Sequence, residues 1–216
     1  MYKRQLVERL VVVGLGLIGG SFAKGLRARG VCREVVGVDL DAQARRLAVE
    51  LGVVDRCEEQ LAAACQGADV IMLAVPILAM ERVLAELAKL DLGDAILTDA
   101  GSAKGNVVRA ADAVFGGLPA RFVPGHPIAG SEQSGVEAAN GELFKRHKVI
   151  LTPLPQTDAL ALQRVDQLWR ELGADVEHMQ VEHHDQVLAA TSHLPHLLAF
   201  GLVDSCLLYT SPSPRD

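Results

Sequence analysis

Short, continuous apolar runs separated by longer amphipathic stretches make up the hydrophobic pattern of this 216-residue chain. The first run, Leu10 to Val13, is apolar throughout rather than alternating, which is typical of a strand buried on both faces of a parallel sheet. Comparable runs follow along the chain. They predict strands over residues 34–39, 68–75, 95–99, 121–124, 148–152 and 174–179.

The stretches between these runs carry the apolar spacing of amphipathic helices. They predict helices over residues 18–29, 42–51, 78–90, 103–115, 158–172 and 181–204. Asp41 is placed to cap the second helix, and Pro195 is expected to bend or break the last one. The alternation predicts an α/β fold, a Rossmann-type doubly wound and mostly parallel sheet with helices on both faces.

Composition narrows the class of protein. Half of the residues are hydrophobic but only 4% are aromatic, which suits α/β layers better than an aromatic-rich β-sandwich. The net charge of -6 argues against a nucleic-acid partner. We find no unbroken apolar run of bilayer length and no signal peptide, so we expect no membrane partner. The four cysteines have neither zinc nor disulfide spacing, which indicates reduced thiols in a cytoplasmic protein.

A glycine-rich turn follows the first strand and opens the first helix. It reads Gly14-Leu-Gly16-Leu-Ile-Gly19, and Asp39 ends the next strand about 20 positions further on. Gly14 permits the tight turn, Gly16 lets the backbone approach a pyrophosphate, and Gly19 lets helix and strand pack closely. The helix N-terminus favours the anion, and Asp39 can accept hydrogen bonds from ribose hydroxyls. This context predicts a dinucleotide site.

The charge of Asp39 would repel a 2′-phosphate, so we expect NAD as the cofactor, with NADP as the alternative. A flavin site would need further segments that we do not find, and a glycine turn without any nucleotide is the plain structural alternative. The residues expected to bind the cofactor are Gly14, Leu15, Gly16, Leu17, Ile18, Gly19, Asp39, Val75, Pro76 and Ser102.

Catalytic groups should lie beyond the carboxyl ends of the later strands. Ser102 follows the fourth strand and can either cap the next helix or bind a ligand. His126, between Gly125 and Pro127, is expected on a loop with an exposed ring that could accept a proton. His193 and His196 are spaced i, i+3 and would share a helix face.

Other polar residues have plainer interpretations. Glu182-His183-His184-Asp185 resembles a set of metal ligands, but adjacent histidines on a helix diverge and the zinc-protease spacing is absent, so we expect no metal. Lys104 is expected to be solvated, His147 and His178 to lie on the surface, and Trp169 to pack in the core.

Four segments together resemble one family. The sequences GLGLIGGS, DAGSAK, GHPIAGSE and TSHLPH are similar to those of the prephenate/arogenate dehydrogenases, the TyrA-type enzymes of tyrosine biosynthesis, and the resemblance extends over residues 8–204. It implies hydride transfer from a cyclohexadienol carbon to nicotinamide, followed by loss of carbon dioxide. The substrate would be prephenate, giving 4-hydroxyphenylpyruvate, or arogenate, giving tyrosine.

The resemblance also implies roles for individual residues. His126 matches the family histidine that accepts the hydroxyl proton, and Ser102 matches a serine near the nicotinamide. The positions that match the substrate pocket are Ser192, His193, His196 and Glu132, and a solvated loop carboxylate is the alternative for Glu132.

The resemblance divides the chain into parts. We expect a dinucleotide-binding domain over residues 6–179 and the start of a truncated helical substrate and dimerisation domain over 180–205. Residues 1–5 and 206–216 have the composition of non-native ends, with ordinary frayed termini as the alternative. Family members form homodimers and take a substrate-binding arginine from the helical domain. Without it, the present chain is expected to be weakly active or inactive.

The sequence is also compatible with two functions other than prephenate or arogenate dehydrogenation. One is another Rossmann reductase of small acids, for which no matching catalytic lysine is found. The other is an NAD-binding module without catalysis, against which the two histidine segments argue.

Overall fold

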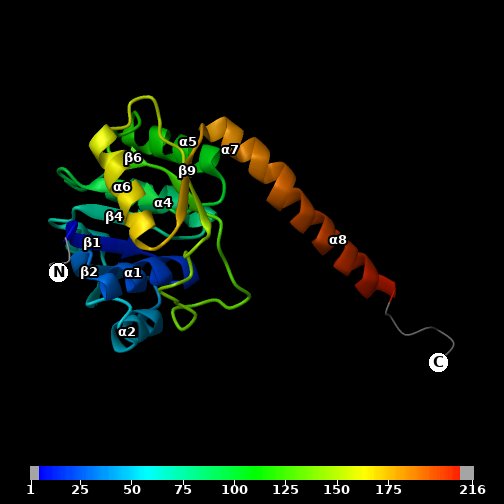
Figure 1. Cartoon of the computed structure of the whole chain (residues 1–216), viewed down its shortest axis with the longest axis horizontal. Coiled ribbons are helices and arrows are strands. Elements are labelled where there is room, and N and C mark those ends of the chain that lie inside the picture. The colour runs from blue at the N-terminus through cyan, green and yellow to red at the C-terminus, as the bar shows by residue number, and fades with distance from the viewer. Residues whose placement is uncertain (1–4, 210–216) are drawn as a thin grey trace.

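A parallel sheet forms the centre of the structure (Figure 1). The computed structural model describes residues 5–209, with side chains to residue 206. The sheet has six strands in the order β3-β2-β1-β4-β5-β6, the Rossmann order. Its strands are β1 (Val7–Val13), β2 (Cys32–Val38), β3 (Arg56–Glu58), β4 (Val70–Leu73), β5 (Ile96–Asp99) and β6 (Phe122–Val123). The predicted fold class is confirmed.

Helices cover both faces of this sheet. One face packs against α1 (Leu17–Arg29), α2 (Ala42–Glu50) and α6 (Ala159–Glu171), and the other against α3 (Leu61–Cys65), α4 (Ile77–Leu87) and α5 (Lys104–Phe115). The continuous apolar run of β1 is explained by this layering, because Leu10 and Val12 face one core and Val11 and Val13 face the other.

Large side chains anchor the first of these cores. Trp169 is fully buried, as expected, and its ring lies 4.6 Å from that of Phe22 and 5.0 Å from that of Phe144, measured between centroids. Asp41 caps α2 as predicted, since its side chain accepts a hydrogen bond from the backbone of Gln43 at 2.8 Å. Local capping and aromatic packing therefore agree with the sequence pattern.

A second, smaller sheet was not expected. It contains β7 (Gly125–Pro127), β8 (Lys148–Leu151) and β9 (Asp175–His178), with β7 antiparallel and β9 parallel to β8. The segment expected to be a histidine loop is thus the edge strand β7. Neither β3 nor α3 was predicted, because three-residue and five-residue elements are too short to show a period.

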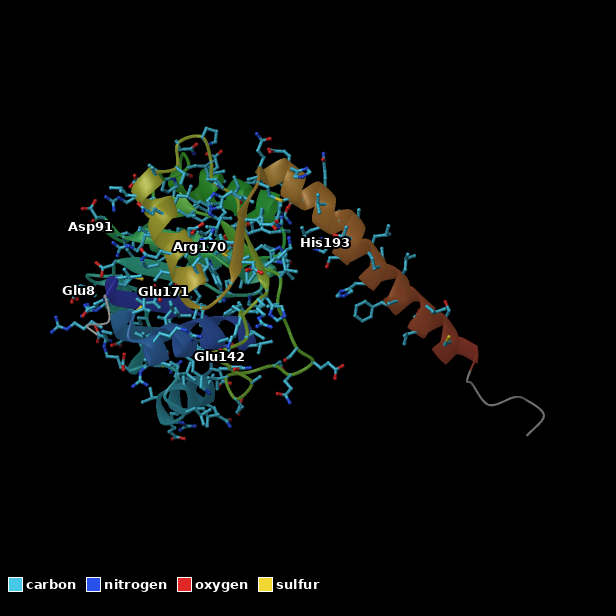
Figure 2. All side chains as sticks on the ribbon, viewed as in Figure 1. Glu8, Asp91, Glu142, Arg170, Glu171 and His193 are labelled. Carbon is cyan, nitrogen blue, oxygen red and sulfur yellow. The ribbon has the colours of Figure 1, made fainter. Side chains whose placement is uncertain are left out.

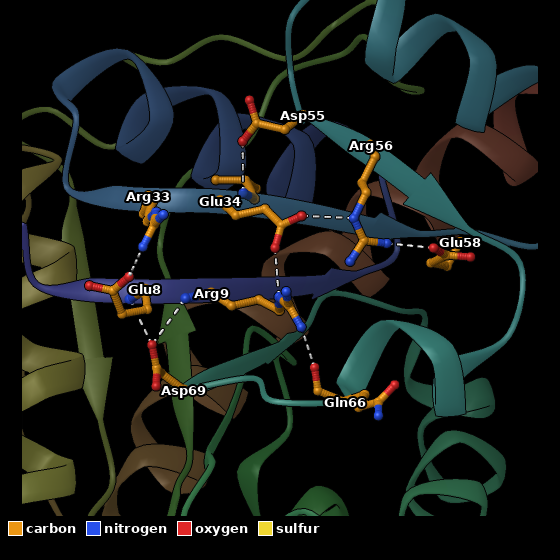
Figure 3. A network of polar contacts seen from close by, with 10 residues as sticks. Glu8, Arg9, Arg33, Glu34, Asp55, Arg56, Glu58, Gln66 and Asp69 are labelled. Atoms are coloured by element: carbon orange, nitrogen blue, oxygen red, sulfur yellow. Dashed lines mark hydrogen bonds and ion pairs between the residues drawn. The ribbon is translucent and has the colours of Figure 1, made fainter.

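Charged side chains tie the amino-terminal half of β1 to its neighbours, as Figure 3 shows. Glu34 on β2 accepts hydrogen bonds from Arg9 on β1 at 2.6 Å and from Arg56 on β3 at 2.8 Å. Asp69 accepts from the backbone N–H groups of Glu8 at 2.6 Å and of Arg9 at 3.0 Å. These contacts hold three strands in register at the edge opposite the glycine turn.

The carboxyl-terminal part of the described chain is one long helical run that leaves the body (Figure 1). It consists of α7 (Val181–Leu188), the π-helical turn η1 (Ala189–His193) and α8 (Leu194–Tyr209). Pro195 does not break the run. Instead the backbone widens just before it, with the N–H of Leu194 donating to the carbonyl of Ala189. A π-turn accommodates the proline ring, which lacks an N–H and crowds the preceding turn.

This run differs from the sequence expectations in two further ways. The helix continues through residues 206–209, where no helical period was evident. By length and composition, Val181–Cys206 also qualifies as a membrane-spanning helix; a single such helix is weak evidence, because a protein-packing helix passes the same test. The remainder of the proposed non-native ends, residues 1–4 and 210–216, lies outside the described residues.

Candidate active site at the carboxyl edge of the sheet

Strand register brings the two key segments to the same edge. Val13 of β1 pairs with Leu73 of β4, and Leu73 pairs with Asp99 of β5. Neighbouring strands lie about 4.8 Å apart, so the ends of β1 and β5 are separated by about 10 Å. The glycine turn after Val13 and the polar groups around Asp99 therefore face one crevice, where open α/β sheets bind ligands.

The three glycines of the turn have distinct surroundings. Gly14 has a φ of +92°, and a Cβ there would lie 2.5 Å from the carbonyl oxygen of Ala74. At Gly19 a Cβ would lie 2.0 Å from the carbonyl oxygen of Gly14, so this residue allows the close packing of helix and strand. At Gly16 a Cβ would meet nothing within 4 Å. Gly16 is therefore not required by the protein's own packing, and it begins α1 without a side-chain cap.

Asp39 is held beside this turn. Its carboxylate accepts hydrogen bonds from the backbone of Leu15 at 2.8 Å and of Asp41 at 3.0 Å. A pocket of about 310 Å³ adjoins it. Four of the residues expected to bind the cofactor line this pocket, namely Gly14, Asp39, Val75 and Pro76, and Leu40 and Arg82 join them. The last two were not foreseen, although Leu40 directly follows Asp39.

His126 differs from its expected setting. It lies on β7, not on a loop, and only 9% of the residue is exposed. Its Nδ1 is 2.9 Å from Nε2 of His184. Among residues 5–209, its Nε2 has no hydrogen-bond partner and is not among the fully enclosed polar atoms that lack one. One ring nitrogen is thus committed to the protein and the other is open to a ligand.

The chain of contacts continues beyond His184. Nδ1 of His184 is 2.8 Å from Oδ1 of Asp185. The same carboxylate accepts hydrogen bonds from the backbone N–H of Lys104 at 2.9 Å and of Gly105 at 2.8 Å. Asp185 therefore caps α5, in the position that the sequence offered to Ser102.

A buried ion pair lies next to this chain. Lys104 is fully buried, contrary to the expectation of a solvated lysine, and its ammonium pairs with Asp99 and donates to the carbonyl of Gly125. Asp99 also accepts from the backbone of Gly101 at 2.7 Å and of Gly125 at 3.2 Å. The pair fixes the backbone on either side of the crevice and positions β7 against β5.

Burial and nearby cations keep the histidines neutral. Burial lowers the pKa of His126 to about 3, and Lys104, His184 and His193 add to this while Asp185 opposes it. Burial also lowers the pKa of His184 against the pull of Asp185. Burial alone would raise the pKa of Asp185, but hydrogen bonds from His184, Gly105 and Lys104 lower it. The line of contacts from His126 to Asp185 therefore contains two neutral imidazoles and one carboxylate.

The other expected site residues are more exposed. Ser102 lies at the surface and makes no cap, because Ala103 is the N-cap of α5. Glu132 is exposed on the loop after β7. Ser192 and His193 lie on η1, and His196 lies on α8 (Figure 2 labels His193). Of these, only His193 acts on His126, through its charge.

Sequence reasoning missed four members of the site: Asp99, Lys104, His184 and Asp185. A signal existed for Asp99, which ends a buried strand at the crevice. His184 and Asp185 were considered only as metal ligands. Their partners lie 58 and 81 residues away in sequence, so no local pattern could reveal the contact.

The fold and the glycine turn with its acidic partner define the class, a dinucleotide-binding domain of the Rossmann type. Residues 22–178 match the model of the prephenate dehydrogenase nucleotide-binding domain, and residues 180–214 match that of the prephenate dehydrogenase dimerization domain. The chain belongs to the prephenate dehydrogenase family of oxidoreductases.

Individual relatives agree with this assignment. The chain is 38% identical to a cyclohexadienyl dehydrogenase of Zymomonas mobilis, with 91% of this chain and 66% of that protein covered. It is 36% identical to a prephenate dehydrogenase of Bacillus subtilis, with 92% and 54% covered. The chain thus spans between about half and two thirds of the length of these curated relatives.

Solved structures show the same similarity. A prephenate dehydrogenase from Aquifex aeolicus, in complex with hydroxyphenyl propionate and NAD+, superposes with a TM-score of 0.88 at 39% identity, covering 96% of this chain and 71% of that one. A Synechocystis arogenate dehydrogenase gives a TM-score of 0.81 at 34% identity, covering 92% and 69%.

Proposed function

We propose that this chain is the dinucleotide-binding part of a prephenate dehydrogenase, which oxidises and decarboxylates prephenate to 4-hydroxyphenylpyruvate with NAD. The observation that carries the proposal is a neutral, buried His126 whose Nε2 has no hydrogen-bond partner among residues 5–209, on a strand that is bound through Gly125 to Asp99 at the carboxyl end of β5. The relatives named prephenate, cyclohexadienyl and arogenate dehydrogenases support it. Arogenate is the alternative substrate.

The residues present fit a dinucleotide. The open space at Gly16 and the uncapped start of α1 provide a cradle for a pyrophosphate, with the helix dipole favouring the anion. The pocket beside Asp39 suits the adenosine part, and its carboxylate favours NAD over NADP. Val75, Pro76 and Ser102 complete the proposed contacts.

His126 is the proposed general base. A bound nicotinamide supplies the acceptor for the substrate's hydride. As the carbon bearing the hydroxyl is oxidised, Nε2 of His126 accepts the hydroxyl proton, because a carbonyl is forming there. The low pKa of His126 keeps its imidazole neutral at neutral pH, so one of its two nitrogens is available to accept a proton. Ser102 is proposed to orient the reacting groups.

The substrate's carboxylates are assigned to groups on η1, α8 and the loop after β7. We propose Ser192, His193 and His196 as hydrogen-bond donors to them and Glu132 as a group at the rim. His193, His196 and Glu132 are exposed here, and Ser192 is half-buried. The relatives are longer than this chain, and we propose that a complete pocket needs helical residues beyond those present, so that the present chain turns over substrate weakly.

The proposed function also divides the chain into two domains. Residues 6–179 form the proposed dinucleotide domain and residues 180–205 begin the helical domain, which we propose pairs with a second copy in a cytoplasmic homodimer. No nucleic-acid or membrane partner is proposed, since the net charge is -6 and the apolar run belongs to the dimerization match.

The test uses the natural protein expressed from its whole gene. It is assayed with prephenate and arogenate as substrates and with NAD and NADP as cofactors. Changing His126→Asn should lower kcat by about 10²- to 10⁴-fold, the usual contribution of a general base. NAD binding should persist. The matched control is His147→Asn, at an exposed histidine. Unchanged turnover in His126→Asn would refute the proposed role.

A further inference from the structure

Asp185 stands at the end of a line of hydrogen bonds that starts at His126. Three donors converge on its carboxylate: the backbone N–H groups of Lys104 and Gly105, and Nδ1 of His184. The next link joins Nε2 of His184 to Nδ1 of His126 at 2.9 Å. The two imidazole rings meet edge to face, at 67°. The order of the groups along this line decides where each proton lies.

A carboxylate can only accept hydrogen bonds, so Nδ1 of His184 must carry a proton. In a neutral imidazole the other nitrogen is then an acceptor. Nε2 of His184 consequently requires a donor, and Nδ1 of His126 is the atom in reach. With its proton on Nδ1, His126 presents a lone pair on Nε2.

The other tautomer of His184 would prevent His126 from accepting a proton at Nε2. If His184 carried its proton on Nε2, that nitrogen would donate, and Nδ1 of His126 would have to accept. A neutral His126 would then hold its proton on Nε2 and could not take another there. The complete burial of the His184 side chain disfavours the doubly protonated form, although Asp185 attracts charge and Lys104 and Asp99 act on it from the adjoining elements.

We propose that Asp185 is a positioning residue that acts through His184 to hold His126 in the tautomer whose Nε2 accepts the substrate's proton. This inference rests on the proposed role of His126 as the base. Asp185 makes no hydrogen bond to His126 and reaches it through His184. It is held by the first two backbone N–H groups of α5, where the helix dipole favours a negative charge.

Asp185 also makes the state of His126 depend on how α7 packs. Asp185 and His184 belong to α7, whereas the groups they serve lie on α5 and β7. Docking of α7 on α5 therefore establishes the acceptor state of His126. A dinucleotide domain cut before α7 would retain the glycine turn and lose this state.

The experiment reads the tautomer directly, in the 216-residue chain, by nitrogen NMR of ¹⁵N-labelled histidine at pH 7.5. In the parent chain, His126 should be protonated at Nδ1 and unprotonated at Nε2. In Asp185→Asn, an amide with an NH₂ donor replaces the carboxylate that accepts three hydrogen bonds, so His184 is no longer held with its proton on Nδ1. His126 should then shift measurably toward the Nε2-protonated form. The His126 signals are identified by their loss in His126→Asn.

A matched control is available in Asp166→Asn. Asp166 also accepts from a histidine, at 2.9 Å from Nε2 of His178, but neither residue is hydrogen-bonded to His126, His184 or Asp185. The control should alter the His178 signals and leave those of His126 unchanged. Amide spectra like those of the parent chain verify that Asp185→Asn is folded.

A second variant decides the matter if Asp185→Asn does not fold. His184→Phe keeps the shape of the ring and the cap on α5 but removes the acceptor for Nδ1 of His126, so the Nδ1-protonated form should again lose population. Nδ1 protonation of His126 retained in the folded variants, or Nε2 protonation in the parent chain, would overturn the proposal.

Kinetics separate this inference from the proposed function. In the natural protein expressed from its whole gene, Asp185→Asn should lower kcat by about 10²-fold or more, with NAD affinity within about twofold of the parent, as expected for loss of a general base. If His126→Asn abolishes turnover but Asp185→Asn leaves the tautomer of His126 unchanged, the role of His126 as the base is supported and the positioning role of Asp185 is refuted. If His126→Asn leaves turnover intact, the proposed function fails whatever the tautomer.

Discussion

At the scale of single residues, the burial of His126 has a thermodynamic consequence. The folded protein holds this imidazole neutral, with its pKa lowered to about 3, whereas the unfolded chain has the ordinary value of 6.5. Below pH 6.5 the unfolded chain binds a proton that the folded chain excludes. Protonation therefore favours unfolding between those two values and has no such effect above 6.5.

We predict that the free energy of unfolding falls with decreasing pH from 6.5 toward 3, with His126 contributing at most about 1.4 kcal/mol per pH unit. In His126→Gln this contribution should vanish and the pH dependence should become shallower. The measurement is urea unfolding at a series of pH values. His147→Gln, at an exposed site, should keep the parent slope; identical slopes for parent and His126→Gln would contradict the prediction.

Lys104 shows why a single residue needs its surroundings. In sequence it is one lysine after a small-residue turn, and a solvated position was the natural expectation. In the structure its ammonium lies between Asp99 and the carbonyl of Gly125, and the side chain has no exposure. A buried cation is tolerated only with such partners, because its desolvation is costly.

At the scale of elements, the glycine turn separates ligand binding from folding. Gly16 faces open space, while Gly19 lies against the backbone of Gly14 and the side chain of Ala74. The same substitution should therefore have different effects at the two positions.

We predict that Gly16→Ala leaves the folded state at least as stable as the parent but weakens NAD binding, because its methyl group occupies the space that a pyrophosphate needs. Gly19→Ala should destabilise the fold by about 1–3 kcal/mol, since the methyl group overlaps backbone atoms. Thermal unfolding and calorimetric titration with NAD measure both. Equal stability losses at Gly16 and Gly19 would contradict this separation.

The helical run after β9 shows how a helix can contain a proline without breaking. A proline inside a helix normally breaks it, yet η1 absorbs Pro195 by widening to a π-turn, and Thr191 donates its hydroxyl to the carbonyl of Val187 at 2.7 Å. The run stays continuous. Ser192 and His193 therefore share one uninterrupted helix with His184 and Asp185.

At the scale of the whole molecule, the outstanding feature is the exposed apolar surface of α8. Its exposed residues include Leu194, Leu197, Leu198, Phe200, Leu202 and Val203, with 51–74% of each accessible. Contiguous apolar surface of this kind is typical of an interface. The match to a dimerization domain supports the proposal that a second copy of the chain covers this surface.

We predict that the 216-residue chain self-associates through this surface. The double variant Leu197→Ser and Phe200→Ser should raise the dissociation constant about tenfold or more, because two large side chains lose their burial. Sedimentation across a concentration series measures it. Leu78→Ser, on an even more exposed leucine of α4, serves as the control; equal weakening by both changes would contradict the prediction.

Most of the fold and the position of the glycine turn could be predicted from the sequence. Periodicity and glycine spacing predicted the parallel sheet, its helices and the turn at Gly14, because these depend on contacts close in the chain or on repeated burial. Asp41 and Trp169 behaved as expected for the same reason. Element ends differed by one or two residues in most cases, since helix and strand ends have little periodic signal.

The arrangement around His126 was decided only by the tertiary structure. The sequence marked His126 for chemistry, but it could not show that the ring is buried, that β7 is a strand, or that His184 and Asp185 complete the line. Those contacts join residues 58 and 81 positions apart. Their physical cause is the packing of α7 on α5, which removes water from the site and leaves each polar group to find its partner in the protein.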